Sequence, residues 1–192
     1  MNLEPVFALA TDTLWGLACR ADDYDSVQKI FQLKGRQFDQ PLTLFVADHQ
    51  AAGKIQHIPQ DLIPWLEHHW PGPLTFISRS VSRAYQHCHP SSERIGIRIP
   101  RHEGTLDLLR ELSIPLAVTS FNLSGQKPAK TRTELLQLFS GQVTQIVGNM
   151  CSHSIESSVI TLDGTDLRIL RGTRVQTQEL KLSLPHPYKI LP

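Results

Sequence analysis

Residues 157–170 read SSVITLDGTDLRIL, and this stretch decides the fold class of the chain. Two strand-like runs, 157–162 and 167–170, flank the pair Asp163-Gly164. An Asp-Gly pair between such runs is a strong signal for a β-hairpin, whose two strands are antiparallel. The rest of the chain alternates strand-like and helix-like stretches, which is typical of α/β folds with parallel pairing. The sequence therefore predicts an α/β fold whose sheet is mixed.

Upstream of the hairpin, the clearest strand is marked by alternation of side-chain type. Ile95, Ile97 and Ile99 alternate with Gly96 and Arg98, which is the period of a half-buried strand. Shorter apolar runs predict further strands at 5–10, 42–47, 74–77 and 115–120.

Helices are expected between these strands. Asp23 is placed to cap a helix that carries Val27, Ile30 and Phe31, and Gly35 is placed to end it directly after Lys34. Three more helices are expected: at 61–70, across Leu106, Leu109 and Leu112, and after a cap at Thr131 or Thr133.

Composition points to an ordinary globular protein. The chain has 192 residues, 40% of them hydrophobic, and 19 basic against 18 acidic residues give a net charge of +1. A charge this small neither requires nor excludes a polyanionic partner, so an anion site must come from local clustering. Three widely spaced cysteines indicate a reducing compartment, and no apolar run approaches the ~20 residues of a membrane span. The cytoplasm is the expected location, with no membrane contact.

The first candidate site is the triplet Lys34-Gly35-Arg36 at the expected helix end. Arg presents a bidentate fork and Lys a compact charge, so the pair can hold phosphate or carboxylate oxygens. The alternative is that both cations only complement the negative end of the helix dipole.

The second candidate site is Thr119-Ser-Phe-Asn-Leu-Ser-Gly125, where an apolar strand ends. Ligands of α/β proteins usually bind beyond strand ends. If the strand geometry continues, Ser120 and Asn122 share one face and Phe121 the other. A plain turn is the alternative, because Ser, Asn and Gly are common turn residues.

The third candidate site is 11–17, TDTLWGL, which joins hydroxyls to an aromatic beside a glycine. It suits a small polar pocket for an amino acid, or else a strand-turn-strand with a core Trp. Arg98 and Arg171 each lie in an apolar strand and face either solvent or an anion cavity.

Common catalytic signatures are missing from the sequence. It contains no GxxxxGK[ST] phosphate loop, no GxGxxG dinucleotide motif and no GxSxG nucleophile elbow. The nine histidines show no zinc-ligand spacing.

Taken in this order, the clusters resemble the YrdC-like (TsaC) family of threonylcarbamoyl-adenylate synthases. The matching stretches are TDTLWGLACRA, IFQLKGRQFDQPLTLFVAD, WPGPLTFI, IGIRIPRHE, LAVTSFNLSGQKPAKT, ESSVI and LRILRGTRV, which together run from residue 11 to about 175. The paired signatures Lys-x-Arg and Ser-x-Asn, the hallmark of active members, stand at Lys34/Arg36 and Ser120/Asn122. Ala10 and Trp15 stand where the family more usually has Pro and Tyr or Phe.

The resemblance implies a single domain, residues 1–175, with an open twisted mixed sheet and flanking helices around a large basic cavity. Residues 176–192 are expected to be a C-terminal extension. The implied reaction joins L-threonine, bicarbonate and ATP into threonylcarbamoyl-AMP and pyrophosphate, with Mg²⁺ on the ATP and no dedicated protein metal site. Other proteins then transfer the group to tRNA, and weak tRNA binding by this chain is a further expectation.

The resemblance also assigns roles by motif. Lys34 and Arg36 are the expected catalytic cations. The expected ATP-binding residues are Lys34, Arg36, Arg98, Ser120, Asn122, Ser124, Ser158 and Arg171. The expected threonine-binding residues are Thr13, Trp15 and Thr119.

Three other functions stay open on the sequence. They are the carbamoyl-adenylate chemistry of hydrogenase-maturation proteins, an RNA-binding module that uses a basic cavity, and a catalytically silent paralogue. Intact Lys34, Arg36, Ser120 and Asn122 argue against the last of these.

Overall fold

The stretch 157–170 forms the hairpin that its sequence predicts, in a computed structural model of the chain. Strand β8 (Ser158–Asp163) pairs antiparallel with β9 (Asp166–Arg171), and Gly164 takes a left-handed φ of 61° in the turn. The structure describes residues 2–35, 41–139, 141–149, 155–172, 174–181 and 184–191, with the backbone alone at 174–177.

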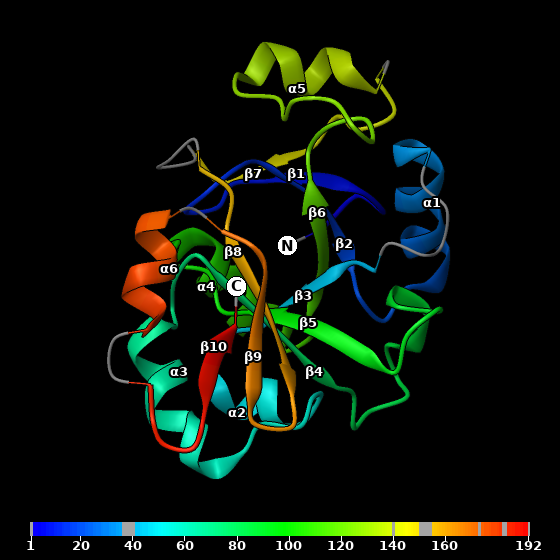
Figure 1. The fold of residues 1–192 in the computed structure, drawn as a ribbon. Coiled ribbons are helices and arrows are strands. Elements are labelled where there is room, and N and C mark those ends of the chain that lie inside the picture. The colour runs from blue at the N-terminus through cyan, green and yellow to red at the C-terminus, as the bar shows by residue number, and fades with distance from the viewer. Residues whose placement is uncertain are drawn as a thin grey trace.

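Ten strands from these residues form one twisted mixed sheet, in the order β10-β9-β8-β4-β5-β3-β6-β2-β1-β7 (Figure 1). Four of the pairs are parallel, namely β1–β7, β3–β5, β4–β8 and β9–β10. The predicted mixed sheet is therefore confirmed. The other strands are β1 (Phe7–Leu9), β2 (Gly16–Arg20), β3 (Thr43–Phe45), β4 (Leu74–Arg79), β5 (Arg94–Arg98), β6 (Leu116–Ser120), β7 (Ile146–Val147) and β10 (Lys189–Leu191).

The helices flank this sheet, and α1 packs against β2 (Figure 1). Helix α5 lies beyond one end of the sheet, above β1, β6 and β7 in this view. None of the helices in the described ranges is both long and apolar enough to cross a membrane. The helices are α1 (Tyr24–Lys34), α2 (His49–Gly53), α3 (Ile63–His69), α4 (Glu103–Leu112), α5 (Arg132–Leu138) and α6 (Arg174–Lys181), with 3₁₀ turns at Gln60–Leu62 and Gln86–Cys88.

Helix α1 begins and ends where its capping residues predict. The Asp23 carboxylate accepts from the backbone N–H of Ser26 at 3.1 Å, which satisfies a free donor of the first turn. Gly35 ends the helix at φ 58°, a left-handed conformation that favours glycine. These caps fix Lys34 as the last residue of α1.

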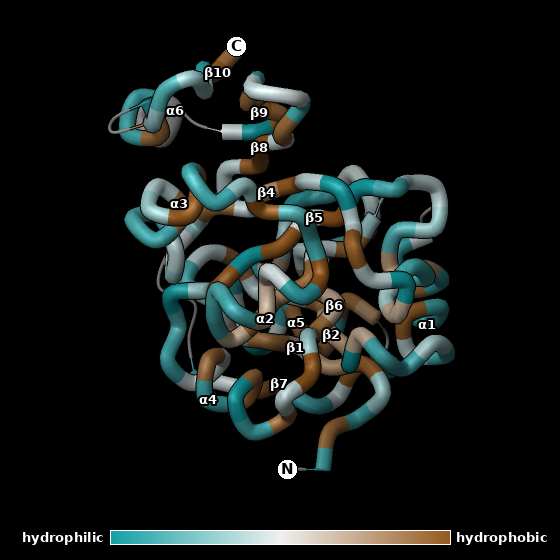
Figure 2. Tube along the Cα trace, turned by 90° about the horizontal axis from the view of Figure 1, so that it is seen from below, coloured by the Kyte–Doolittle hydropathy of each residue, from teal (hydrophilic) through white to brown (hydrophobic). Residues whose placement is uncertain are grey.

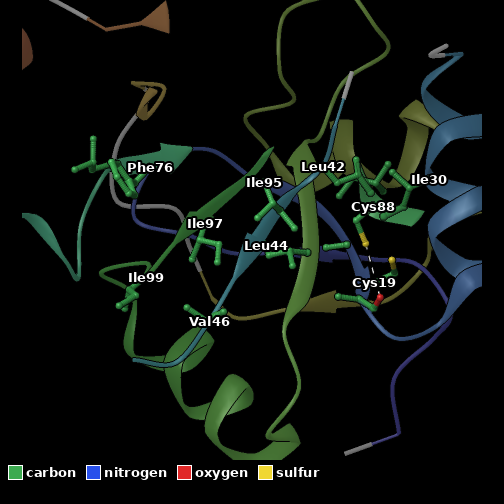
Figure 3. Packing of buried hydrophobic residues seen from close by; sticks show 14 of the residues in the cluster. Cys19, Ile30, Leu42, Leu44, Val46, Phe76, Cys88, Ile95, Ile97 and Ile99 are labelled. Atoms are coloured by element: carbon green, nitrogen blue, oxygen red, sulfur yellow. Dashed lines mark hydrogen bonds between the residues drawn. The ribbon is translucent and has the colours of Figure 1, made fainter. Parts of the chain in front are cut away.

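Two apolar clusters hold the sheet, one on each face. The larger takes Leu44 of β3 and Ile95 and Ile97 of β5 together with Ile30 of α1, and Figure 3 shows these side chains in one layer. The smaller takes Phe45 and Leu116 with residues of α4. In Figure 2 the hydrophobic segments lie mainly along the central strands, whereas hydrophilic segments lie mainly toward the outside.

Strand β5 differs from the half-buried strand that alternation predicts. Gly96 and Arg98 are buried as well as the isoleucines, so neither face of β5 is open to bulk solvent. Alternation reports which residues share a face, but it does not report whether the polar face meets solvent or a ligand pocket. Arg98 is only 3% exposed, so its predicted solvent-facing alternative is wrong.

The C-terminal segment is part of the sheet architecture. Helix α6 starts at Arg174, and β10 pairs parallel with β9 at the edge of the sheet. The carbonyl of Leu180, a buried residue of α6, accepts from the Trp65 indole of α3 at 3.2 Å. The expected boundary at residue 175 stays a prediction.

Candidate functional site

A cavity of ≈ 240 Å³ opens on the face of the sheet that carries Arg98. Its walls come from the turn after β1, from the face of the strands between β2 and β9, and from Glu156 and Ser157 just before β8. Most lining side chains that carry polar atoms bear a hydroxyl or a guanidinium. The polar lining is Thr11, Thr13, Thr43, Thr75, Arg98, Thr119, Ser120, Glu156, Ser157 and Arg171.

The register of the sheet brings these side chains together. Arg98 of β5 pairs with Phe45 of β3, and Gly96 pairs with Thr43, so positions two apart project to the same face. On the other side of β5, Val159 of β8 lies between Thr75 and Arg171. The two arginines thus reach one pocket although 73 residues (171 minus 98) separate them in the sequence.

Arg98 is fixed by three partners. Its Nε donates to the Gly72 carbonyl at 3.0 Å, its Nη1 to the Thr13 hydroxyl at 2.9 Å, and its Nη2 to the Asp12 carboxylate at 2.6 Å. Burial lowers the pKa of the Arg98 guanidinium and Asp12 acts in the opposite direction, but an arginine stays protonated in proteins. The result is a permanent cation held rigidly in the cavity wall.

A chain of hydroxyls continues from Arg98 through the turn after β1. The Thr11 hydroxyl donates to the Leu14 carbonyl at 2.6 Å, so in its 3.1 Å contact with Thr13 the Thr13 hydroxyl is the donor. Thr13 in turn accepts from Arg98. Trp15 and Thr119 also line the cavity. The three residues predicted for threonine binding, Thr13, Trp15 and Thr119, therefore all line the one cavity.

Arg171 also lines the cavity, but its side chain is 49% exposed. Its Nε and Nη2 donate to the carbonyl and hydroxyl of Ser157 at 3.1 and 3.2 Å, and its Nη1 pairs with Glu156 at 3.3 Å. Glu156 is the acidic side chain among the residues that line the cavity. Exposed pairs of this kind are weak, so Arg171 can exchange Glu156 for an anionic ligand at little energetic cost.

Lys34 contacts the Ser-x-Asn pair where β6 ends. Lys34 is 1% exposed, and its ammonium donates to the Ser120 carbonyl at 2.6 Å and to the Asn122 amide oxygen. Strand β6 ends at Ser120, and the Asn122 N–H turns back to the Ser120 carbonyl at 3.0 Å, so the strand geometry does not continue. The two side chains still meet, because the Ser120 hydroxyl donates to the same amide oxygen at 2.7 Å. Phe121 points the other way and packs against Phe139. Ser120 lines the cavity, whereas Lys34 and Asn122 do not.

The remaining predicted residues are placed differently. Arg36 lies outside the described residues. Ser124 is exposed and away from the cavity, and only its backbone N–H reaches Lys34, at 3.3 Å from the carbonyl. Ser158 is buried beside the cavity, whereas its neighbour Ser157 lines it. Their assigned ligand roles stay predictions.

Several lining or supporting residues have no role assigned from the sequence. Thr43, Thr75, Glu156 and Ser157 line the cavity, and Asp12, which lies in the third candidate site, anchors Arg98 from 86 residues away. Side chains two positions apart in a strand share a face, so the neighbours of Arg98 and Arg171 on adjacent strands could have been identified if the strand pairing were known. The pairing register cannot be derived from one sequence. In the described part of the chain no three His, Cys, Asp or Glu side chains gather as a metal site.

Comparison with known proteins identifies a protein family for this chain. A family model named for Sua5, YciO and YrdC, and described as telomere recombination, matches residues 1–173. A threonylcarbamoyl-AMP synthase of Bacillus subtilis (strain 168) is 34% identical over 160 residues, which cover 81% of this chain and 46% of the relative. One from Mus musculus is 36% identical over 137 residues, with 70% and 48% covered. The chain spans about half the length of the curated relatives it matches.

Solved structures share the fold. A crystal structure of Pyrococcus abyssi Sua5 complexed with L-threonine superposes with a TM-score of 0.84 at 26% identity, covering 97% of this chain and 55% of that one. Escherichia coli YciO gives 0.77 at 22% identity, with 86% and 82% covered, which shows a shared fold alone. By its family model, its sheet and its motifs, the chain belongs to the Sua5/YciO/YrdC family.

Proposed function

We propose that this chain is a threonylcarbamoyl-AMP synthase, which condenses L-threonine, bicarbonate (or CO₂) and ATP into threonylcarbamoyl-AMP and pyrophosphate. The observation that carries the proposal is the placement of two arginines in one cavity that threonine hydroxyls also line, one of them bonded to Arg98. Curated relatives from a bacterium, an archaeon and mouse bear this name. The product would supply separate transfer proteins that form N6-threonylcarbamoyladenosine in tRNA, in the cytoplasm.

The chemistry needs cations more than it needs a nucleophilic side chain. The deprotonated amine of threonine adds CO₂ to give a carbamate, and a carbamate oxygen then attacks the α-phosphorus of ATP while the bond to pyrophosphate breaks. Both reactants are anionic, so fixed positive charge must reduce their repulsion and stabilise the leaving pyrophosphate. Lys34 and Arg36 are proposed for this role, and Mg²⁺ would enter as the companion of ATP.

Binding roles follow from position around the cavity. Arg98 with Thr13, Trp15 and Thr119 would line the site for the amino acid, in which Arg98 presents a cation to a carboxylate. Ser120 and Arg171 would contact the nucleotide. Arg98 thus serves the amino acid in this proposal as well as the ATP site to which its motif assigns it.

Pyrophosphate release tests the proposal. The purified chain is expected to release pyrophosphate from MgATP only when L-threonine and bicarbonate are both present, because the carbamate is the nucleophile. Omitting either substrate is expected to lower the rate to background. Release supported equally by carbamoyl phosphate without threonine would reassign the chain to carbamoyl-adenylate chemistry. Tight tRNA binding without any release would instead favour an RNA-binding module.

A further inference from the structure

The side-chain amide of Asn122 is bonded on both of its ends. Its oxygen accepts from the Lys34 ammonium and, at 2.7 Å, from the Ser120 hydroxyl. Its nitrogen donates to the Gln126 carbonyl at 2.5 Å. These partners fix which end is which, since a cation and a hydroxyl proton require an acceptor and a carbonyl requires a donor.

This bonding limits what Asn122 can offer to a ligand. An amide oxygen has two lone pairs, and the two donors found here occupy them. Of the two N–H donors on the amide nitrogen, the Gln126 carbonyl takes one. Asn122 is 8% exposed and Lys34 is 1% exposed, and of Lys34, Ser120 and Asn122 only Ser120 lines the cavity. What sets Asn122 apart from Lys34 is therefore its bonding, because its amide oxygen is fully occupied by protein donors.

The Asn122 amide oxygen holds the Lys34 ammonium in one direction. A lysine ammonium sits on a flexible four-carbon stem, and its direction must be imposed by neighbours. Lys34 ends α1, and its carbonyl accepts from the backbone N–H of Ser124, in the same loop that carries Asn122 and Gln126. Asn122 thus makes one hydrogen bond within the loop, to Gln126, and one to the end of α1, to Lys34.

We propose that Asn122 is a positioning residue, which orients the Lys34 ammonium for the phosphates of the nucleotide and does not itself bind the nucleotide. The inference rests on the proposed function only in requiring that Lys34 contacts ATP. It assigns the two parts of the Ser-x-Asn pair different tasks: Ser120 lines the cavity, and Asn122 holds the Lys34 cation.

A double-mutant cycle on ATP affinity tests this assignment. The dissociation constant of ATP is measured by titration calorimetry on the full 192-residue chain, without threonine or bicarbonate, for wild type, Asn122→Ala, Lys34→Met and the double variant. Met keeps most of the volume of Lys and removes its charge. If Lys34→Met does not fold, Lys34→Gln takes its place. Gln126→Ala is the control, because Gln126 contributes only its backbone carbonyl to the network.

The expected result is strong non-additivity, because Asn122 acts through Lys34. Asn122→Ala is expected to weaken ATP binding about tenfold in wild type but less than about twofold in the Lys34→Met chain. Gln126→Ala is expected to leave the affinity unchanged. Melting temperatures of all variants separate a loss of affinity from a loss of folded protein.

Three outcomes overturn the proposal. The first is that the two single effects multiply, which makes Asn122 an independent nucleotide ligand. The second is an Asn122→Ala chain that melts earlier but binds ATP normally once folded, which leaves Asn122 only a turn-forming role. The third is unchanged or absent ATP binding across the cycle. Non-additive ATP binding without any pyrophosphate release would uphold Asn122 as a positioning residue and contradict only the proposed reaction.

Discussion

Replacing Lys34 by glutamate is expected to abolish ATP-dependent pyrophosphate release. Lys34 is 1% exposed, and its ammonium lies against the Ser120 carbonyl and the Asn122 amide oxygen. A carboxylate there faces two acceptor oxygens and repels the phosphates, by about 4 kcal/mol for each like charge at ~4 Å and an effective dielectric constant of ~20. The measurement is the release rate per folded molecule, with folding checked by near-UV circular dichroism.

Two companion variants make this result interpretable. Lys34→Met removes the charge without adding repulsion and is expected to lower turnover about tenfold to a hundredfold, the value of one charge-assisted hydrogen bond. Lys54→Glu makes the same change of charge at an exposed position after α2 and is expected to behave as wild type. Lys34→Glu chains that fold and turn over normally would remove Lys34 from the site.

Replacing Asp12 by alanine is expected to cost about 3–5 kcal/mol of stability, because it leaves the Arg98 cation buried without its partner. The two side chains are only 4% and 7% exposed, and their charged atoms are 2.6 Å apart. For a chain of this size the loss corresponds to a melting temperature lowered by roughly 6–20 °C. Thermal unfolding followed by circular dichroism measures it.

The control is a pair of the same kind on the surface. Asp107 and Arg110 on α4 are 71% and 54% exposed at 2.7 Å, so Asp107→Ala is expected to cost less than about 1 kcal/mol. Asp12→Asn keeps an oxygen for Arg98 and is expected to lose less stability than Asp12→Ala. Equal, small effects for Asp12→Ala and Asp107→Ala would show that the buried pair is not a structural anchor.

Local signals predicted the parts of the fold that local chemistry decides. Asp23 and Gly35 delimited α1, the Asp163-Gly164 pair gave the β8–β9 hairpin, and Thr131 forms a capping box with Glu134 at the start of α5. In each case the residues that form the feature lie within a dozen positions of one another. Capping and turn chemistry of this kind is visible in the sequence itself.

Features that depend on distant partners escaped prediction. Strand β7 has two residues and β10 has three, and each exists because an edge strand accepts it. Asp12 looked like part of a polar turn until the fold placed Arg98 against it. The site was also predicted only in part. Motifs predicted several of the residues that line the cavity, but only the structure shows that Ser157 lines it and Ser158 does not.

The identity of the product tests the central claim most directly. The chain is incubated with MgATP, L-threonine and ¹³C-bicarbonate, and the nucleotides formed are analysed by chromatography and mass spectrometry. The account predicts a threonylcarbamoyl-AMP that carries one ¹³C atom in its carbamoyl carbon, formed in step with pyrophosphate. An adenylate without the label, a carbamoyl-AMP without threonine, or no adenylate at all in folded, ATP-binding protein would contradict it.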